Sequence, residues 1–185
     1  MATIRPYDVK DRDRVQALCL TNAGCAEASA DMQQYILNMY CNYYIDCEPE
    51  NCFVAVDDYD NAIGYIICAQ NCDYYEKRFA EDYLPAMLEL GLKYYVDAKL
   101  DIISHTMFKN DYAAHLHIDI LDGYRGQGIG TELIDTLKNH LRSKGLRSVM
   151  LVVGADNDGG IRFYERNGFE KLITTHLGVA MGIHF

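Results

Sequence analysis

Apolar positions recur along the chain with the two periods that distinguish helices from strands. Val15, Leu18 and Cys19 repeat at helical spacing, whereas residues 115–121 alternate polar and apolar side chains as a half-buried strand does. Residues 148–153 are continuously apolar, which is typical of a strand covered on both faces. These patterns predict strands at 3–7, 51–56, 63–69, 115–121, 148–153, 169–175 and 179–185, helices at 11–21, 31–45, 128–144 and 157–166, and an irregular helical segment over 73–104.

The succession of strands and helices indicates one α/β domain. The chain has 185 residues and three prolines, with no internal repeat and no low-complexity run. A chain of this length buries a core large enough to be stable without disulfides or metals. We therefore expect residues 1–185 to form a single domain.

The charge balance narrows the range of partners. Lys and Arg number 17 against 27 Asp and Glu, which gives a formal net charge of −10. A general role on nucleic acid would work against this field. The first residues contain no basic and apolar leader, and no apolar stretch approaches the ~20 residues that a membrane span needs. We expect a cytoplasmic protein that binds neither nucleic acid nor membrane.

The seven cysteines are an odd number and contain no Cys-x-x-Cys pair. Free cysteine usually behaves as a small apolar residue. We expect these thiols to be reduced and mostly buried, and we expect no metal site.

A glycine-rich turn between a strand and an amphipathic helix carries the main chemical signal. Residues 122–131 read Asp-Gly-Tyr-Arg-Gly-Gln-Gly-Ile-Gly-Thr. Glycines at 126, 128 and 130 remove Cβ atoms and permit positive φ, so that backbone N–H groups converge on an anion at the start of the helix. Arg125 adds a positive charge. The glycine order matches neither the Rossmann fingerprint nor a P-loop. The turn therefore predicts a diphosphate-binding cradle of another kind.

A second motif follows at residues 157–169, which read Asn-Asp-Gly-Gly-Ile-Arg-Phe-Tyr-Glu-Arg-Asn-Gly-Phe. Together the two segments resemble the GNAT superfamily of acyl-CoA-dependent N-acetyltransferases. The run Ala-His-Leu-His-Ile-Asp-Ile-Leu over 114–121 is similar to a bacterial subgroup related to the acetyltransferase-like domain of O-GlcNAcase. The first family pattern is met by Arg125, Gly128 and Gly130, and the second by Asn157, Tyr164, Gly168 and Phe169, with Gly160 where Ala is usual and Asp122 where Pro is common.

The resemblance implies a fold and a cosubstrate. The fold is α/β (α+β), GNAT-like, with a mixed, mostly antiparallel central sheet of about seven strands flanked by helices on both faces. Acetyl-CoA would be the acyl donor, with its diphosphate on the glycine-rich turn and its pantetheine beside the preceding strand. The implied binding residues are Ile118, Ile120, Leu121, Arg125, Gly126, Gln127, Gly128, Ile129, Gly130, Thr131, Asn157, Gly160, Phe163 and Tyr164.

The resemblance also makes Tyr164 the proton donor to the departing thiolate, and a phenol with a pKa near ~10 suits this role. Asp119 and His117 are both candidates for the base that takes a proton from the acceptor amine. Alternation places them on one face of their strand, unless a β-bulge reverses the facing. His105 is expected on the surface. No cysteine is marked as a nucleophile, so we expect direct attack in a ternary complex.

Two functions stay open. The chain is either an N-acetyltransferase that moves an acetyl group from acetyl-CoA to an amine acceptor, or a CoA-binding or interaction domain without turnover. In the resembling family the acceptor is chosen by the regions that correspond here to residues 22–44 and 73–104. The acceptor's identity and the presence of a homodimer are not determined by the sequence.

Overall fold

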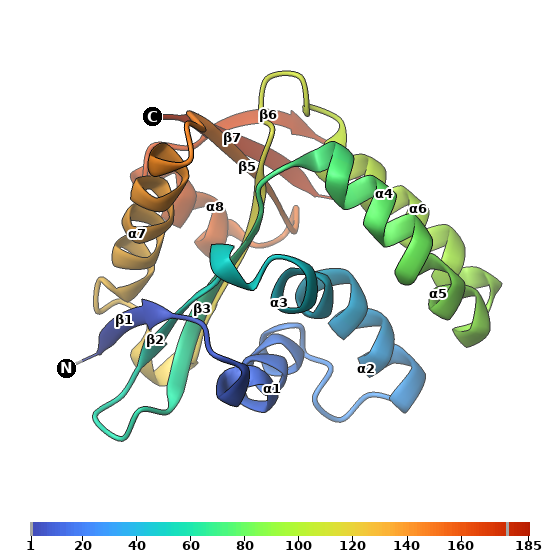
Figure 1. Ribbon diagram of the computed structural model, residues 1–185, viewed down its shortest axis with the longest axis horizontal. Helices are drawn as coiled ribbons and strands as arrows, with labels where there is room; N and C mark the ends of the chain where they lie inside the picture. Colours follow the sequence, from blue (N-terminus) through green and yellow to red (C-terminus); the bar gives the residue numbers. More distant parts are fainter. Residues whose placement is uncertain (1, 177) are drawn as a thin grey trace.

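The structure, a computed structural model, describes residues 2–176 and 178–185. Its described strands form one seven-stranded sheet in the order β1-β2-β3-β4-β5-β7-β6 (Figure 1). Neighbouring strands run antiparallel except β4 and β5, which run parallel. This confirms the predicted mixed, mostly antiparallel sheet. The strands are β1 (Thr3–Pro6), β2 (Phe53–Val56), β3 (Ala62–Ala69), β4 (His115–Ile120), β5 (Ser148–Val153), β6 (Glu170–Thr174) and β7 (Val179–His184).

Helices cover both faces of this sheet, with α7 and α8 on one face and α1 to α6 on the other (Figure 1). Leu116 of β4 packs in the core beneath α7 and α8. The opposite core is rich in buried tyrosines, such as Tyr44 and Tyr75. The helices are α1 (Arg12–Asn22), α2 (Ala30–Leu37), α3 (Tyr43–Cys47), α4 (Cys72–Asp82), α5 (Leu84–Leu90), α6 (Leu92–Thr106), α7 (Ile129–Ser143) and α8 (Asp158–Arg166). None of the described helices is long and apolar enough to span a bilayer.

Two helical regions differ in detail from the sequence pattern. The helix expected over 31–45 is interrupted between α2 and α3 by a π-helical turn, Asn38–Asn42. Such a turn adds one residue to the helical repeat, and apolar spacing does not reveal it. The irregular segment over 73–104 contains α4, α5 and most of α6, with Pro85 in the first turn of α5 and Gly91 at φ 138° before α6.

Strand β4 presents two chemically different faces. Its register with β3 is unbroken from His115 to Ile120, so no bulge interrupts the alternation. Leu116 therefore faces α7 and α8, while His115 contacts Tyr44 and Tyr75 on the opposite side. The predicted grouping of polar side chains on one face of this strand is confirmed.

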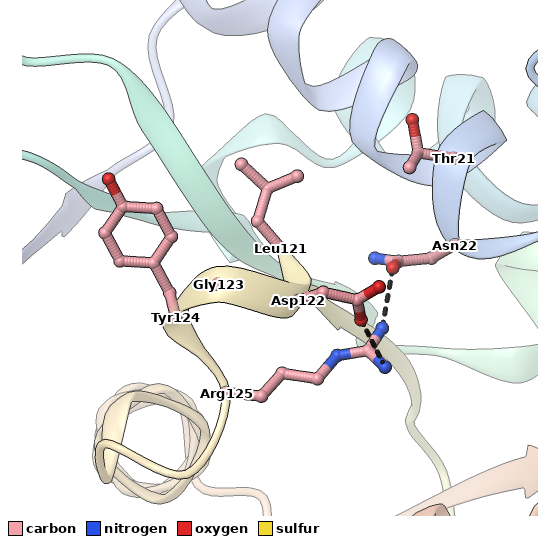
Figure 2. Close-up of a pocket in the computed structure, with 7 residues that line it drawn as sticks. All are labelled: Thr21, Asn22, Leu121, Asp122, Gly123, Tyr124 and Arg125. Atoms are coloured by element: carbon pink, nitrogen blue, oxygen red, sulfur yellow. Dashed lines mark hydrogen bonds and ion pairs between the residues drawn. The ribbon is translucent and has the colours of Figure 1, made fainter.

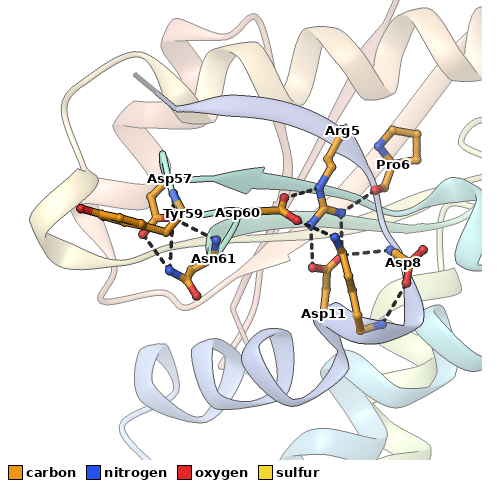
Figure 3. Close-up of polar contacts among 9 residues, drawn as sticks. Arg5, Pro6, Asp8, Asp11, Asp57, Tyr59, Asp60 and Asn61 are labelled. Atoms are coloured by element: carbon orange, nitrogen blue, oxygen red, sulfur yellow. Dashed lines mark hydrogen bonds and ion pairs between the residues drawn. The ribbon is translucent and has the colours of Figure 1, made fainter.

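A cluster of ion pairs joins β1 to the turn between β2 and β3 (Figure 3). The Arg5 guanidinium donates to both carboxylate oxygens of Asp11, at 2.7 and 2.8 Å, and its Nε donates to Asp60 at 2.9 Å. Asp11 is 4% exposed. Burial raises the pKa of Asp11, but hydrogen bonds from Arg5 and from the Asp8 backbone outweigh burial, and the net pKa is lowered. The Asp11 carboxylate is therefore stabilised in its charged form only in the folded chain.

We expect Asp11→Asn to lower the free energy of unfolding by about 2 kcal/mol at pH 7, since it weakens hydrogen bonds between charged groups. Because the folded pKa of Asp11 is depressed, this stabilisation is present above the unfolded pKa and is lost as pH falls through the folded pKa. Urea unfolding should therefore show the difference in stability between variant and wild type shrinking as pH falls below the ordinary aspartate pKa of ~3.9. The matched control is Asp13→Asn, which removes an exposed carboxylate two residues further along, in the first turn of α1. Equal effects of the two variants would contradict this role.

Candidate active site

The parallel strands β4 and β5 separate after a single point of contact. Their register contains one pair, His115 with Met150, and the Met150 N–H donates to the Ala114 carbonyl at 3.0 Å. On its other edge β4 pairs with β3 along its whole length. Backbone groups alternate between the two edges of a strand. Since the Leu121 N–H donates to Ile63 of the β3 edge at 2.9 Å, the N–H and C=O of Ile118 face the gap toward β5.

This gap contains a cavity of about 210 Å³, which we call the inner cavity. It brings together predicted site residues that are far apart in the sequence: the β4 residues His117, Ile118 and Asp119 and, across the gap, Asn157 and Tyr164. The other eight lining residues are not among the site residues that the sequence predicted. The full lining is Cys19, Asn22, Ala23, Tyr40, Leu116, His117, Ile118, Asp119, Val152, Val153, Gly154, Asn157 and Tyr164.

Asp119 is a carboxyl group held in a poorly solvated place. The hydroxyl of Tyr65, which is fully buried in β3, donates to Asp119 Oδ2. Burial raises the pKa of Asp119 to about 7, against the lowering effects of Tyr65, Arg125 and Asn22. A carboxyl with this pKa exchanges a proton near neutral pH, which suits a general base.

His117 has a different environment although it lies on the same face of β4. Its Nε2 lies 2.9 Å from the hydroxyl of Tyr44, and that hydroxyl also lies 2.9 Å from His115 Nε2. Burial and the neighbouring His105 hold the pKa of His117 well below its usual value. His117 is therefore a neutral imidazole and a weaker base than Asp119.

The prediction that His105 lies on the surface is wrong. His105 is 3% exposed, and its ring centroid lies 5.1 Å from that of His117. The reason is the orientation of α6, which turns an apolar stripe toward solvent, with Val96 46% and Ile103 58% exposed. The polar side of the helix therefore covers the polar face of β4.

Tyr164 is buried on α8, with its ring centroid 5.2 Å from that of Phe163 and 5.6 Å from that of Phe169. Burial raises the pKa of Tyr164, and the charge of Asp119 raises it further. The phenol is therefore protonated at neutral pH and is able to donate.

The glycine-rich turn has the backbone shape that an anion cradle requires. Gly126 has φ 77° and Gly128 has φ 86°, and a Cβ at either position would meet no atom within 4 Å. Gly128 is the N-cap of α7, so the N–H groups of the first helical turn have no partner within the helix. These open amides and the positive end of the helix dipole fit a diphosphate.

Gly130 has a different reason to be glycine. A Cβ there would lie 2.8 Å from Phe163 Cζ and 3.2 Å from Ile120 Cδ1. Gly130 therefore allows α7 to approach α8 and the end of β4 closely, which fixes the glycine-rich turn beside the gap.

Arg125 is held by neighbours in this structure (Figure 2). Its guanidinium contacts Asp122 at 2.8 Å, donates to Asn22 Oδ1 at 2.7 Å and donates to the Ile120 carbonyl at 3.0 Å. These residues border a second, outer cavity of about 380 Å³, lined by Thr21, Asn22, Leu121, Asp122, Gly123, Tyr124 and Arg125. The Arg125 side chain thus extends from the glycine-rich turn to the end of α1. Asp122 partly balances its charge.

Asn157 caps α8, and its Oδ1 accepts the Gly160 N–H at 2.8 Å. A Cβ at Gly160 would lie 2.8 Å from Asn157 Nδ2, so glycine permits this cap. The same asparagine lines the inner cavity.

As for metals, the described residues contain no group of three or more His, Cys, Asp or Glu side chains that could hold an ion.

The comparison with known proteins finds a match to one family model. The model of the acetyltransferase (GNAT) family matches residues 19–169 of the chain. N-alpha-acetyltransferase 30 of Schizosaccharomyces pombe is 27% identical over 145 residues, covering 78% of this chain and 74% of that protein. An uncharacterized N-acetyltransferase of Methanocaldococcus jannaschii is 44% identical over 59 residues, or 31% of this chain, and the match covers only 26% of that protein.

Solved structures share the fold. The crystal structure of SsHAT has a TM-score of 0.86 at 23% identity, covering 99% of this chain and 98% of that chain. The PaiA N-acetyltransferase from Thermoplasma acidophilum, in complex with coenzyme A, has a TM-score of 0.62 at 16% identity, covering 100% of this chain and 99% of that chain.

The different roles of Gly130 and Gly126 can be tested by measuring the free energy of unfolding of variants. We expect Gly130→Ala to lower the free energy of unfolding by roughly 1–3 kcal/mol, because its Cβ overpacks against Phe163. Combining it with Phe163→Leu should recover part of this loss. Gly126→Ala is the control, because a Cβ there meets no atom. It should lower the free energy of unfolding by roughly 1 kcal/mol through its positive φ alone, and adding Phe163→Leu should recover none of this loss. Urea unfolding measures the two single glycine variants, Phe163→Leu alone and the two double variants. Additive effects of Gly130→Ala and Phe163→Leu would contradict the contact.

Proposed function

Because the chain belongs to the acetyltransferase (GNAT) family, we propose that it moves an acetyl group from acetyl-CoA to an amine acceptor by direct attack in a ternary complex. One observation carries this proposal: Asp119 and Tyr164, from opposite sides of the gap between β4 and β5, line the same cavity. Acetyl-CoA supplies a thioester carbonyl that an amine attacks.

The proposed chemistry assigns each group a proton or a charge. Asp119 accepts the proton that the acceptor amine loses as its nitrogen bonds to the acetyl carbon. The Ile118 N–H, which faces the gap, donates to the carbonyl oxygen as negative charge develops there. The carbon–sulfur bond then breaks, and Tyr164 gives its proton to the departing thiolate. His117 has the weaker claim to the base, since its pKa is depressed and Tyr44 occupies its Nε2.

The cosubstrate is supported by the glycine-rich turn. We propose that the amides of Gly126, Gln127, Gly128, Ile129, Gly130 and Thr131 hold the diphosphate, with Arg125 released from Asp122 to add its charge. The pantetheine would follow Ile118 and Ile120, next to Phe163, Asn157 and Gly160. The Leu121 N–H donates to the Ile63 carbonyl in the sheet and is not free to bind the cosubstrate. We therefore propose that Leu121 contacts acetyl-CoA with its side chain, in the outer cavity.

We propose that residues 1–185 act as one acetyltransferase domain in the cytoplasm. The resemblance to the bacterial subgroup related to O-GlcNAcase stays a prediction, as does a homodimer. The competing function, a CoA-binding or interaction domain without turnover, differs in one measurable way: it would bind CoA in a calorimeter and release no thiol from acetyl-CoA with any amine.

We expect Tyr164→Phe to lower kcat about 100-fold, the lower range for loss of a general acid, while the affinity for CoA stays unchanged. Release of free thiol from acetyl-CoA measures the first effect, and calorimetric titration measures the second. Tyr112→Phe is the matched control, because Tyr112 is also buried but lies in a separate apolar cluster with Met150 and Ala180. Equal kcat in Tyr164→Phe and wild type would remove Tyr164 from the reaction.

The pKa of Asp119, about 7, predicts the pH dependence. We expect kcat/KM to rise with pH through about 7, because only the carboxylate accepts a proton, and we expect Asp119→Asn to lose this ascending limb together with most of its activity. The profile of Asp119→Asn is divided by that of the wild type, which cancels titration of the amine itself, and the exposed variant Asp111→Asn is the control, whose ratio should not change with pH. A ratio for Asp119→Asn that does not change through pH 7 would assign the base elsewhere.

A further inference from the structure

Helix α6 carries polar side chains where it meets the sheet and apolar side chains where it meets solvent. His105 is buried, with its ring centroid 5.1 Å from that of His117 on β4. On the opposite side lie five large apolar side chains, each between 42% and 69% exposed: Leu92, Val96, Leu100, Ile103 and Met107. At 3.6 residues per turn these five positions fall within about 80° of the helix circumference. We call this continuous apolar band the α6 stripe.

The α6 stripe has the area that a protein interface needs. Helices α4, α5 and α6 form the side of the molecule opposite α7 (Figure 1), and the exposure of the stripe shows that no described segment covers it. Its five side chains present roughly 500 Å², which is close to the largest apolar patch on a typical monomer. A standard interface covers about 800 Å² on each partner, and about 65% of a homodimer interface is apolar. The α6 stripe therefore supplies the apolar part of one such interface.

The charged side chains on the two edges of the α6 stripe are paired within their own helix. Lys93 Nζ lies 3.7 Å from the Asp97 carboxylate, and Lys99 Nζ lies 5.5 Å from the centroid of the Tyr95 ring. A second copy of this helix therefore brings no unpaired charge to the stripe. An anionic membrane is a less suitable partner, because the formal net charge is −10 and a membrane-bound amphipathic helix needs a solvated basic face. The polar face of α6 is instead buried, with His105 against the ring of His117.

The spacing of the α6 stripe is the same in both directions along the helix from Val96 onward. The steps from Val96 to Leu100, to Ile103 and to Met107 are four, three and four residues. Steps of three and four residues let the ridges of one helix fit the grooves of another. Because this order is symmetric, two antiparallel copies match residue for residue about a two-fold axis between positions 100 and 103. The antiparallel arrangement also places opposite ends of the two helix dipoles side by side.

The area, the paired charges and the symmetric spacing point to the same partner, a second copy of this chain. We propose that the α6 stripe is the interface of a homodimer in which the α6 helices of two copies pack antiparallel about a two-fold axis. Leu100 of one copy faces Ile103 of the partner subunit, and Val96 faces Met107 of the partner subunit. Each copy thereby covers the exposed apolar band of the other. This inference goes beyond the proposed function and uses none of the residues assigned to acetyl transfer.

Sedimentation equilibrium of the whole chain measures this association. We expect wild type at roughly 100 µM to be mostly dimer, with a Kd in the micromolar range. Leu100→Glu and Ile103→Lys should each raise the Kd more than tenfold, because each places two unpaired charges beside the two-fold axis. The matched control is Ile173→Glu on β6, since Ile173 is also exposed, at 40%, but lies outside α6. Its Kd should equal that of the wild type.

Mixing the two variants tests the antiparallel pairing. In a mixed dimer the carboxylate introduced at position 100 faces the ammonium introduced at position 103 of the other copy, while a native leucine and isoleucine face each other across the axis. We expect the equimolar mixture to form dimers with a Kd at least tenfold lower than that of either variant alone. Val96→Glu and Met107→Lys form a second pair, expected to behave in the same way, whose charges suit the helix dipole and therefore do not disturb α6.

Three results would overturn the proposal: a monomeric wild type, a dimer that Ile173→Glu weakens as much as Leu100→Glu does, or mixtures of folded variants that stay monomeric. Urea unfolding establishes that each variant is folded. Vesicles of phosphatidylcholine and phosphatidylglycerol represent the alternative partner. Wild type that stays monomeric and cosediments with these vesicles would assign the α6 stripe to a membrane surface instead. None of these measurements depends on acetyl transfer, so the proposed function and this inference are tested separately.

Discussion

The separation of β4 from β5 is the constraint on which the site depends. The two strands share one register pair, His115 with Met150, while each is paired along its length with its other neighbour, β3 or β7. The sheet therefore stays continuous although its middle is open. The opening leaves the Ile118 backbone facing the gap and lets residues of β4 and α8 line one cavity. If β4 and β5 were hydrogen-bonded along their whole length, those backbone groups would bond to β5 and no ligand could enter between the strands.

Burial then shifts the pKa values of three side chains that line the inner cavity. It raises the pKa of Asp119 to about 7, raises that of Tyr164 and lowers that of His117. At neutral pH, Asp119 on one side of the gap therefore exchanges its proton, while Tyr164 on the other side keeps its proton. This division matches the needs of a transfer in which the incoming amine loses a proton and the outgoing thiolate gains one.

The elements and the glycine-rich turn were predictable because they depend on local order. Spacing located every strand, and the glycines at 126 and 128 do have positive φ. Tertiary effects were not predictable. His105 is buried because α6 turns its apolar stripe outward. Nothing in the sequence at the end of α1 predicts that Asn22 contacts Arg125, about a hundred residues further along the chain. The packing reason for Gly130 likewise depends on Phe163 of another helix.

Hydrogen exchange of individual amides, with and without CoA, tests the open strand edge most directly. The Ile118 and Ile120 amides face the gap, whereas the Leu121 amide is bonded to Ile63 in the sheet. We expect added CoA to slow exchange at the Ile118 and Ile120 amides, while exchange at the Leu121 amide changes little. Unchanged exchange at Ile118 and Ile120 in protein saturated with CoA would contradict the claim that this edge receives the cosubstrate.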